Sequence, residues 1–400
     1  MDQATQPAPA NPFAPYRRVG HALALIILAV SCVEFARNWL HPSSRDFVSF
    51  WGAAKLAWAG TPALAYNNAA LHAVQVKVAS FSGSAEMPFP YAPAFLLILM
   101  PFAALPFPLA MVVWTLGTWG LYAFAARRFA PEAGWLPLAF PAIFATAAIG
   151  QNGFLTATLF LVGLALLHRG RQFAAGLVLG CLVLKPQLAL MLPVAMLAGR
   201  EWRVIAGAIV SATALMLVGV LAFGPAVTTA WLDQMPLYAR IARDGLVGWH
   251  KLVSVYAAAR EAGMPEQAAF TLHAVVALAA AALVARCWTS KTEPMAKAAV
   301  LAAATMLASP YVYLYDALVL IPAFVWLVQR RAPIALVATL WLSPLLIIVQ
   351  TAGAVPVNIG PLLPIALLGL SYRAWRDAPT ANAADRSIDL GKRGGLVAGC

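Results

Sequence analysis

Asp46 is the first residue of this sequence whose type and position could do chemistry. It follows the first apolar segment directly, within the stretch HPSSRDFVSFWGAAKLAWAG (residues 41–60). A carboxylate placed there can act as a general base that takes a proton from an attacking hydroxyl group. It can also cap the helix that follows, because aspartate accepts hydrogen bonds from the free amides of a first helical turn. Residue type and position leave both interpretations open.

Two further charged residues stand at the ends of apolar segments. Lys185 ends an apolar run in LVLKPQLALML and has no acidic neighbour in sequence. A charge there is costly unless the side chain reaches the membrane surface or meets an anion. Asp316 begins another apolar segment, in SPYVYLYD (309–316), where a carboxylate usually has a partner.

Several uncharged or weakly charged side chains lie at comparable positions. Gln151 and Asn152 could cap the helix that follows them, and the SPY triplet at 309–311 could simply interrupt a helix. His250 and Lys251 could be ordinary loop residues. Each of these explanations is plausible singly, but together the residues form a set of carboxylate, cation, amide and tyrosine.

The composition decides which class of protein must position this set. Of 400 residues, 62% are hydrophobic and 10% charged, and the mean hydropathy is +0.78. A soluble domain has about 25% charged residues. Apolar stretches of about 20 residues cross the hydrocarbon core as helices, since lipid offers the backbone no hydrogen bonds. The sequence therefore predicts an all-α integral membrane protein.

The net charge of +12 is a topology signal rather than a sign of nucleic-acid binding. The basic residues lie between apolar runs, as expected for cytoplasmic loops, and we expect no nucleic-acid partner. Their main positions are residues 17–18, 168–171, 200–203, 286–291, 330–331 and 373–376. The cysteines at 32, 181, 287 and 400 have no metal-type spacing, so no metal site is predicted.

Hydropathy predicts about 12 to 13 membrane spans. They lie near residues 20–37, 92–107, 109–126, 135–149, 152–167, 172–184, 187–199, 203–223, 266–287, 295–308, 315–329, 332–350 and 360–372. Residues 1–16 are predicted to be a disordered cytoplasmic leader, 17–376 a single transmembrane domain, and 377–400 a cytoplasmic tail.

The basic loops also predict which side each loop faces. With both termini in the cytoplasm, every basic loop after residue 150 falls inside, and the long loops 38–91 and 224–265 fall outside. Between residues 92 and 150 the count fails. Either LMPFAALPFP forms a re-entrant or kinked piece, or one of the predicted spans is not a full crossing.

The first outer loop is predicted to contain a helix lying in the membrane interface. Phe47, Phe50, Trp51, Ala54 and Trp58 fall within one arc at helical spacing. Because the long loops and the polar set share the outer side, function is expected there.

The chemistry that suits this set is transfer of a sugar from a lipid-linked phosphate. Lysine and arginine neutralise phosphate, amides and tyrosines bind sugar hydroxyls, and one carboxylate takes the acceptor's proton. Inverting transfer to an acceptor needs one base, whereas glycoside hydrolysis uses two carboxylates. A transporter or flippase of lipid-linked saccharides is the alternative, and it would show charged or broken spans at the membrane midplane and often inverted repeats. A scaffold without chemistry would show no coherent polar face.

Five stretches of the sequence, in order, resemble glycosyltransferase family 87. They are RDFVSFWGAAKLAWAGTPALAYN (45–67), FPYAPAFLLILMPFAALP (89–106), GQNGFLTATLFLVGLALLHRGR (150–171), AAGLVLGCLVLKPQLALMLPVAML (174–197) and LASPYVYLYDALVLIPA (307–323). The resemblance covers residues 20–372. The family comprises bacterial integral-membrane transferases of the GT-C fold and includes polyprenol-phosphate-mannose-dependent α-mannosyltransferases.

The resemblance implies a polyprenyl-phosphate sugar donor, no nucleotide, a lipid or glycan acceptor, and a periplasmic active site in the bacterial inner membrane. Asp46 matches the family's essential acidic residue and is predicted to be the general base, with Asp316 next in line. Tyr311 and Tyr313 stand where polar or histidine-containing residues are more usual, so the sugar stays undetermined.

The remaining site residues are assigned by the same chemistry. We expect Arg45, Lys185 and Lys251 at the donor phosphate. The sugar and acceptor are expected to contact Tyr91, Gln151, Asn152, Gln187, His250, Tyr311 and Asp316. No cofactor is predicted, and the pattern does not decide whether a divalent metal ion takes part.

Overall fold

The computed structural model describes residues 11–40, 46–79, 87–246 and 248–377. Within these ranges the chain is helical and has no β-strand. Five helices are long and apolar enough to cross a membrane. They are α1 (Arg17–Leu40), α5 (Phe107–Phe129), α10 (Trp202–Phe223), α13 (Glu266–Thr289) and α16 (Ile334–Thr351). The prediction of an all-α, multi-pass membrane protein is confirmed.

Shorter apolar helices fill the bundle between these five. They are α6 (Ala142–Ile149), α7 (Gly153–His168), α8 (Gln172–Gly180), α9 (Met191–Ala198), α14 (Pro294–Ala308), α15 (Ile321–Gln329) and α17 (Leu362–Arg376). Three are extended by 3-10 helices, namely η5 (Cys181–Leu184), η6 (Pro186–Leu188) and η8 (Leu314–Leu320). Each of these helices lies within a few residues of a predicted span.

The centre of the bundle is α14, with α15 beside it. Its sequence PMAKAAVLAAATMLA is rich in alanine, and the residues from Ala298 to Leu307 are almost completely buried. Small side chains let neighbouring backbones approach closely. Helices α13, α15 and α17 all pack against α14, so this helix is the core around which the C-terminal half assembles.

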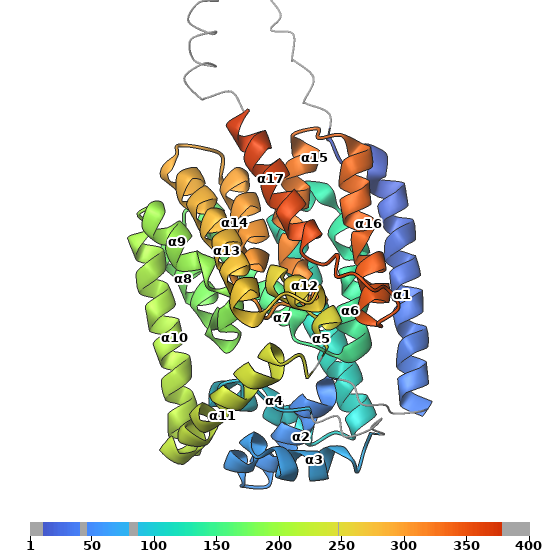
Figure 1. The fold of residues 1–400 in the computed structure, drawn as a ribbon, viewed down its shortest axis with the longest axis vertical. Helices are drawn as coiled ribbons and strands as arrows, with labels where there is room; N and C mark the ends of the chain where they lie inside the picture. The colour runs from blue at the N-terminus through green and yellow to red at the C-terminus, as the bar shows by residue number, and fades with distance from the viewer. Residues whose placement is uncertain (1–10, 41–45, 80–86, 247, 378–400) are drawn as a thin grey trace, which may run out of the picture.

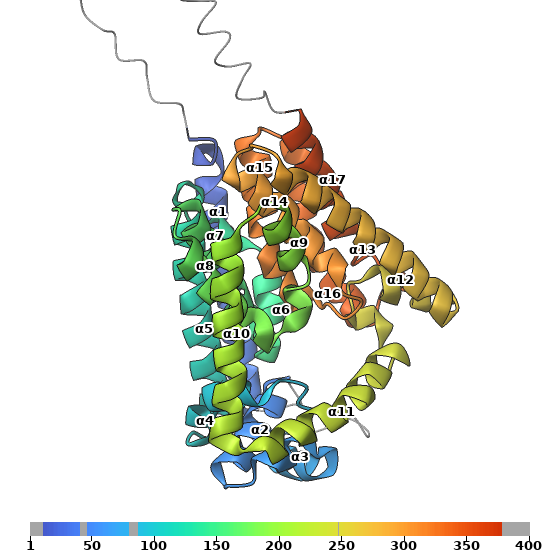
Figure 2. The same ribbon diagram turned by 90° about the vertical axis from the view of Figure 1, so that its left-hand side faces the viewer.

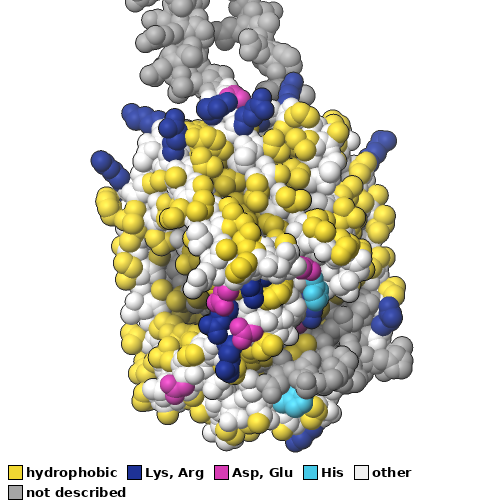
Figure 3. Space-filling model, in the orientation of Figure 1, with side chains coloured by type: hydrophobic (Ala, Val, Ile, Leu, Met, Phe, Trp, Pro, Cys, Tyr) yellow, Lys and Arg dark blue, Asp and Glu magenta, His cyan; other side chains and the backbone are white. Residues whose placement is uncertain are grey.

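The elements at one end of the molecule differ from those at the other. Helix α1 begins and α17 ends at the same end, shown at the top of Figure 1. The opposite end holds α2 (Phe47–Trp58), α3 (Asn68–Gln75), α4 (Pro93–Ala103) and α11 (Pro225–Arg243). Figure 3 shows lysine and arginine side chains gathered along the end where α1 begins and α17 ends, which agrees with the predicted common side of the basic loops.

Helix α4 resolves the count that failed between residues 92 and 150. Its 11 residues stay beside α2 at the end of the molecule opposite the start of α1, and do not run through the bundle to the other end (Figure 1). Helix α5 starts three residues after Ala104, the C-cap of α4. Since the chain enters and leaves α4 without crossing, the remaining spans place Arg127 and Arg128 on the same side as the other basic loops.

Helix α2 is not the surface helix with one apolar face that its aromatic spacing predicts. Ten of its twelve residues are buried, although Trp58 is 59% exposed. A second face of α2 is buried against α3. The small residue Gly52 permits this packing, because a Cβ there would lie 3.0 Å from Leu71 of α3. The aromatic face packs against rings from neighbouring elements. The ring centre of Phe50 lies 5.3–5.9 Å from the ring centres of Tyr91, Phe95 and Trp114.

Helix α11 connects elements at the end of the molecule opposite the start of α1 (Figure 1). In Figure 2 it leads from the lower end of α10 towards α12 (Val255–Glu261). The indole of Trp231 donates to the carbonyl of Pro90 (3.2 Å), and the Tyr238 hydroxyl donates to the carbonyl of Phe89 (3.0 Å). These bonds hold α11 against the segment that precedes α4.

The arrangement predicts that α3 and α11 are exposed on the side opposite the start of α1. In a background without native cysteines, Ala73→Cys and Arg243→Cys should react with an impermeant maleimide from the outer side of right-side-out vesicles. Lys291→Cys, in the loop between α13 and α14, should react only after permeabilisation. Labelling of positions 73 and 243 only from the cytoplasmic side would contradict this topology.

Candidate active site

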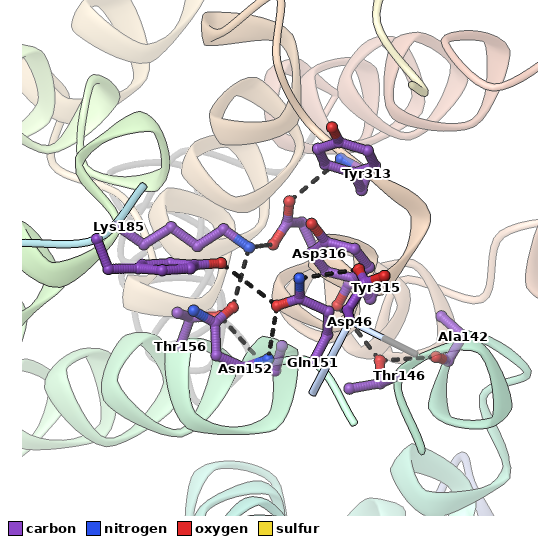
Figure 4. Close-up of polar contacts among 12 residues, drawn as sticks. Asp46, Ala142, Thr146, Gln151, Asn152, Thr156, Lys185, Tyr313, Tyr315 and Asp316 are labelled. Carbon is purple, nitrogen blue, oxygen red and sulfur yellow. Dashed lines mark hydrogen bonds and ion pairs between the residues drawn. The ribbon is translucent and has the colours of Figure 1, made fainter. Parts of the chain in front are cut away.

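Polar side chains from four separate segments converge inside the bundle (Figure 4). They are Asp46 before α2, Gln151 and Asn152 before α7, Lys185 between η5 and η6, and Asp316 in η8. Apart from Asp46, which is half-buried, all are buried. The structure therefore brings together five of the predicted site residues that are far apart in sequence, and we call them the polar cluster.

Two glycines place Gln151 and Asn152. Gly150 ends α6 with φ +67°, and its carbonyl accepts a hydrogen bond from the indole of Trp114 (3.0 Å). Gly153 begins α7 against η8, where a Cβ would lie 2.3 Å from the carbonyl oxygen of Tyr315. Only glycine permits this approach, and it brings the start of α7 against the segment that carries Asp316.

Lys185 is held by a buried ion pair with Asp316. Its Nζ lies 2.5 Å from Asp316 Oδ1 and donates to Asn152 Oδ1 at 3.1 Å. The ammonium also lies 4.4 Å from the ring centre of Tyr315, a favourable cation–π distance. The anion that pairs with Lys185 is thus 131 positions away in sequence, whereas no acidic residue lies close to Lys185 in the sequence.

The second oxygen of Asp316 is also occupied. Oδ2 accepts the backbone N–H of Tyr313 at 3.2 Å, and the residue is 0% exposed. With one oxygen on an ammonium and the other on an amide, the negative charge of Asp316 is compensated within the protein.

Asp46 has different surroundings. Its side chain makes no capping hydrogen bond to α2, so the interpretation as an N-cap is wrong. Instead Oδ2 accepts a hydrogen bond from Gln151 Nε2 at 3.0 Å. The backbone at Asp46 is already helical, with φ −55° and ψ −30°, whereas a capping residue usually has an extended backbone. The carboxylate is therefore directed into the polar cluster.

Tyr91 completes the contacts of Gln151. Its hydroxyl lies 3.4 Å from Gln151 Oε1, and its carbonyl accepts the hydroxyl of Tyr66 at 2.9 Å. Burial, with the negative charges of Asp316 and Asp46, raises the pKa of Tyr91 far above its usual range. The hydroxyl stays protonated and serves as a donor.

Other predicted residues lie outside the polar cluster. His250 and Lys251 belong to η7 (Trp249–Lys251), whose following residue Leu252 forms a β-bridge with Tyr313. Lys251 is exposed. The ring of Tyr311 faces Tyr256 at 6.4 Å. The half-buried side chain of Gln187 forms no hydrogen bond with any part of the chain that the structure describes, and Arg45 lies outside the described residues.

Tyr313 and Tyr315 are functional candidates that the sequence analysis did not assign. Their rings stack at 5.1 Å with an interplanar angle of 8°. Burial and the negative charges of Asp46 and Asp316 raise the pKa of Tyr313, so its hydroxyl stays protonated and can act as a hydrogen-bond donor. Their spacing around Asp316 in YVYLYD is the signal that could have identified them.

The described residues of the polar cluster include no candidate metal centre, and the cluster is separate from an apolar cavity. Among the described residues, no group of three His, Cys, Asp or Glu side chains could hold a metal ion. An apolar cavity of about 410 Å³ lies between α1, α5 and α6, and Phe154 and Ala147 are on its wall. Its lining includes none of the polar cluster.

The sequence of residues 89–310, more than half of the chain, matches the model of glycosyltransferase family 87. The chain belongs to glycosyltransferase family 87. It is therefore a membrane glycosyltransferase, which confirms the resemblance noted from the motifs and sets aside the flippase and scaffold alternatives. Searches of curated proteins and of solved structures found no match.

The matched residues of this family 87 glycosyltransferase contain part of the polar cluster. Of the polar cluster, Gln151, Asn152 and Lys185 lie within 89–310, as does the neighbouring Tyr91, whereas Asp46 and Asp316 lie outside. The case for the two carboxylates therefore rests on their contacts with matched residues. Asp46 is bound by Gln151, and Asp316 is bound by Lys185.

The buried ion pair predicts a stability change in this glycosyltransferase. Lys185→Met should destabilise the protein by about 3–5 kcal/mol, because it leaves Asp316 buried without a cation. Lys185→Met combined with Asp316→Asn should recover much of that loss, since no unpaired charge remains. Thermal unfolding in detergent measures both. Equal losses in the single and double variants would contradict a coupled pair.

Proposed function

We propose that this family 87 glycosyltransferase moves a hexose, mannose-like in type, from a polyprenyl-phosphate donor to a lipid or glycan acceptor. The reaction takes place at the periplasmic face of a bacterial inner membrane and inverts the sugar. Supporting this side, the polar cluster lies where α6 ends and α7 begins, away from the basic loops. The GT-C fold and donor class follow from the resemblance of the motifs.

Asp46 is the general base in this proposal. The observation that carries it is the hydrogen bond from Gln151 to Asp46, made in place of a capping bond to α2. A base must be ionised, oriented and able to reach an acceptor hydroxyl. Asp46 is half-buried, so part of its surface remains accessible for an acceptor hydroxyl to approach.

Asp316 fits a supporting role better than the role of base. Its oxygens are bound by Lys185 and by the amide of Tyr313, and it is completely buried. Protonating it would break the ion pair and leave Lys185 as an unpaired buried charge. We assign Asp316 to the charge balance of Lys185, in addition to its predicted contact with the sugar or acceptor.

Replacing Asp46 by asparagine separates catalysis from folding. Asp46→Asn keeps the size of the side chain but cannot accept the proton, so transfer should fall by about 10²–10⁴-fold while membrane insertion stays normal. Thin-layer chromatography of washed membranes supplied with radiolabelled polyprenyl-phosphate sugars measures the transfer.

Asp233→Asn is the matched control, because Asp233 is an exposed aspartate on α11. It should transfer at the parental rate. Near-parental transfer by Asp46→Asn would remove Asp46 from the role of base and direct attention to Asp316. Loss of transfer in both variants would indicate a general effect of charge at the outer end.

The donor phosphate needs more positive charge than Lys185 supplies. The described part of the polar cluster holds two carboxylates and one ammonium, and that ammonium already contacts Asp316 and Asn152. Lys251 is exposed next to Leu252, which pairs with Tyr313. We therefore assign the direct phosphate contact to Lys251, with Arg45 as the second predicted cation and Lys185 acting through its charge.

Lys251→Ala should raise the KM for the polyprenyl-phosphate donor by about tenfold, the usual worth of a charge-assisted hydrogen bond. It should leave thermal stability unchanged, because the side chain is exposed. Lys77→Ala, which removes another exposed lysine from the outer end, is the control and should leave KM unchanged. An unaltered donor KM in Lys251→Ala would exclude this contact.

A further inference from the structure

Gln151 is fixed in one orientation by its own hydrogen bonds. Its Oε1 accepts the backbone N–H of Asn152 at 3.0 Å and faces the hydroxyl of Tyr91 at 3.4 Å. A backbone N–H can only donate, so the oxygen of the amide must be on that side. The NH₂ group therefore has to point at Asp46, where it lies 3.0 Å from Oδ2.

The elements that carry these atoms are themselves rigidly placed. Gln151 is 7% exposed and lies between Gly150 and Gly153, both of which are in close contact with other segments. Tyr91 is packed among the rings of Phe50, Phe89 and Phe95. The Gln151 amide is bound at its oxygen and buried on a fixed backbone, so it cannot reorient to follow a substrate.

We propose that Gln151 is a positioning residue for Asp46, and that it acts on the general base instead of binding the sugar or acceptor. This inference rests on the proposed role of Asp46. The Gln151 NH₂ group orients the carboxylate and favours its ionised form by donating to it. The Tyr91 hydroxyl and the backbone N–H of Asn152 donate to Gln151, and Gln151 donates to Asp46. The three residues therefore form a hydrogen-bond relay that ends at the base.

Other charges act on Asp46 as well. Among the described residues, the polar and titratable groups close to it are Tyr91 before α4, Lys185 between η5 and η6, Tyr313 before η8, and Tyr315 and Asp316 in η8. Lys185 favours the ionised carboxylate, whereas Asp316 opposes it. The Gln151 variants leave all of these groups in place, so a change in pH dependence reports the amide.

The test is the pH profile of transfer by Gln151→Glu and Gln151→Met. Gln151→Glu replaces the donor by a carboxylate, which repels the negative charge of Asp46 and so favours its protonated form. The acid limb of kcat should move up by about one to two pH units, and transfer should recover as the pH rises. Gln151→Met removes the donor without adding charge and should move the limb in the same direction by less.

Two further variants set the scale. Tyr91→Phe removes one of the two donors to Gln151 Oε1 and should have a smaller effect, because the Asn152 amide remains. Gln267→Glu makes the same chemical change at an exposed position of α13 and should leave the profile unchanged. Because Gln151→Glu places a charge in a buried position, Gln151→Met keeps the test valid if the first variant fails to insert.

The outcomes separate this inference from the proposed function. If Asp46→Asn transfers normally, the base assignment fails whatever Gln151 does. If Asp46→Asn is inactive but the Gln151 variants raise the KM for donor or acceptor with an unmoved acid limb, Gln151 binds substrate and the positioning role is overturned. A shifted acid limb with unchanged KM values supports the relay.

Discussion

A charge buried inside a membrane bundle needs an opposite charge beside it, and in this protein that requirement joins Lys185 to Asp316. Removing an ammonium from water costs several kcal/mol, which is recovered only through close contact with an anion and further hydrogen bonds. Both side chains are almost fully buried. The ion pair therefore requires that the break between η5 and η6 lie against the start of η8. The helical segments around this contact are short because they end at it.

The backbone meets this demand through small residues and irregular helices. Pro186 follows Lys185 and prevents η5 from continuing, so the lysine stands at a turn instead of within a helix. Gly153 lets α7 begin against the carbonyl of Tyr315. On the other side, Gly150 lies so close to Phe47 that a Cβ would be 2.7 Å from the Phe47 Cβ. The same glycine-flanked turn thus contacts η8 and the start of α2, and so sets where both aspartates lie.

Much of this architecture could be predicted because one physical effect dominates each part. The spans follow from hydropathy, and predicted and observed helices agree within a few residues, as for 203–223 and α10 (Trp202–Phe223). Motif order identified the family. The partner of Lys185 could not be predicted, since 131 residues separate it from Asp316 and no local pattern links them. The burial of α2 could not be predicted for a similar reason. In the sequence, Gly52 and Ala53 give no sign of being buried, and the burial becomes evident only once α3 packs against the helix.

The two adjacent amides give the two aspartates of the polar cluster different surroundings. Asn152 binds Lys185 and thereby the ion pair, whereas Gln151 binds Asp46 directly. A neutral amide thus fixes the orientation of Asp46 by a hydrogen bond, whereas Asp316 lies in direct contact with an ammonium. Gln151 and Asn152 are consecutive residues of one turn, so this turn fixes the position of Asp46 relative to the cation of the ion pair. The proposed division of roles between the two aspartates depends on that arrangement.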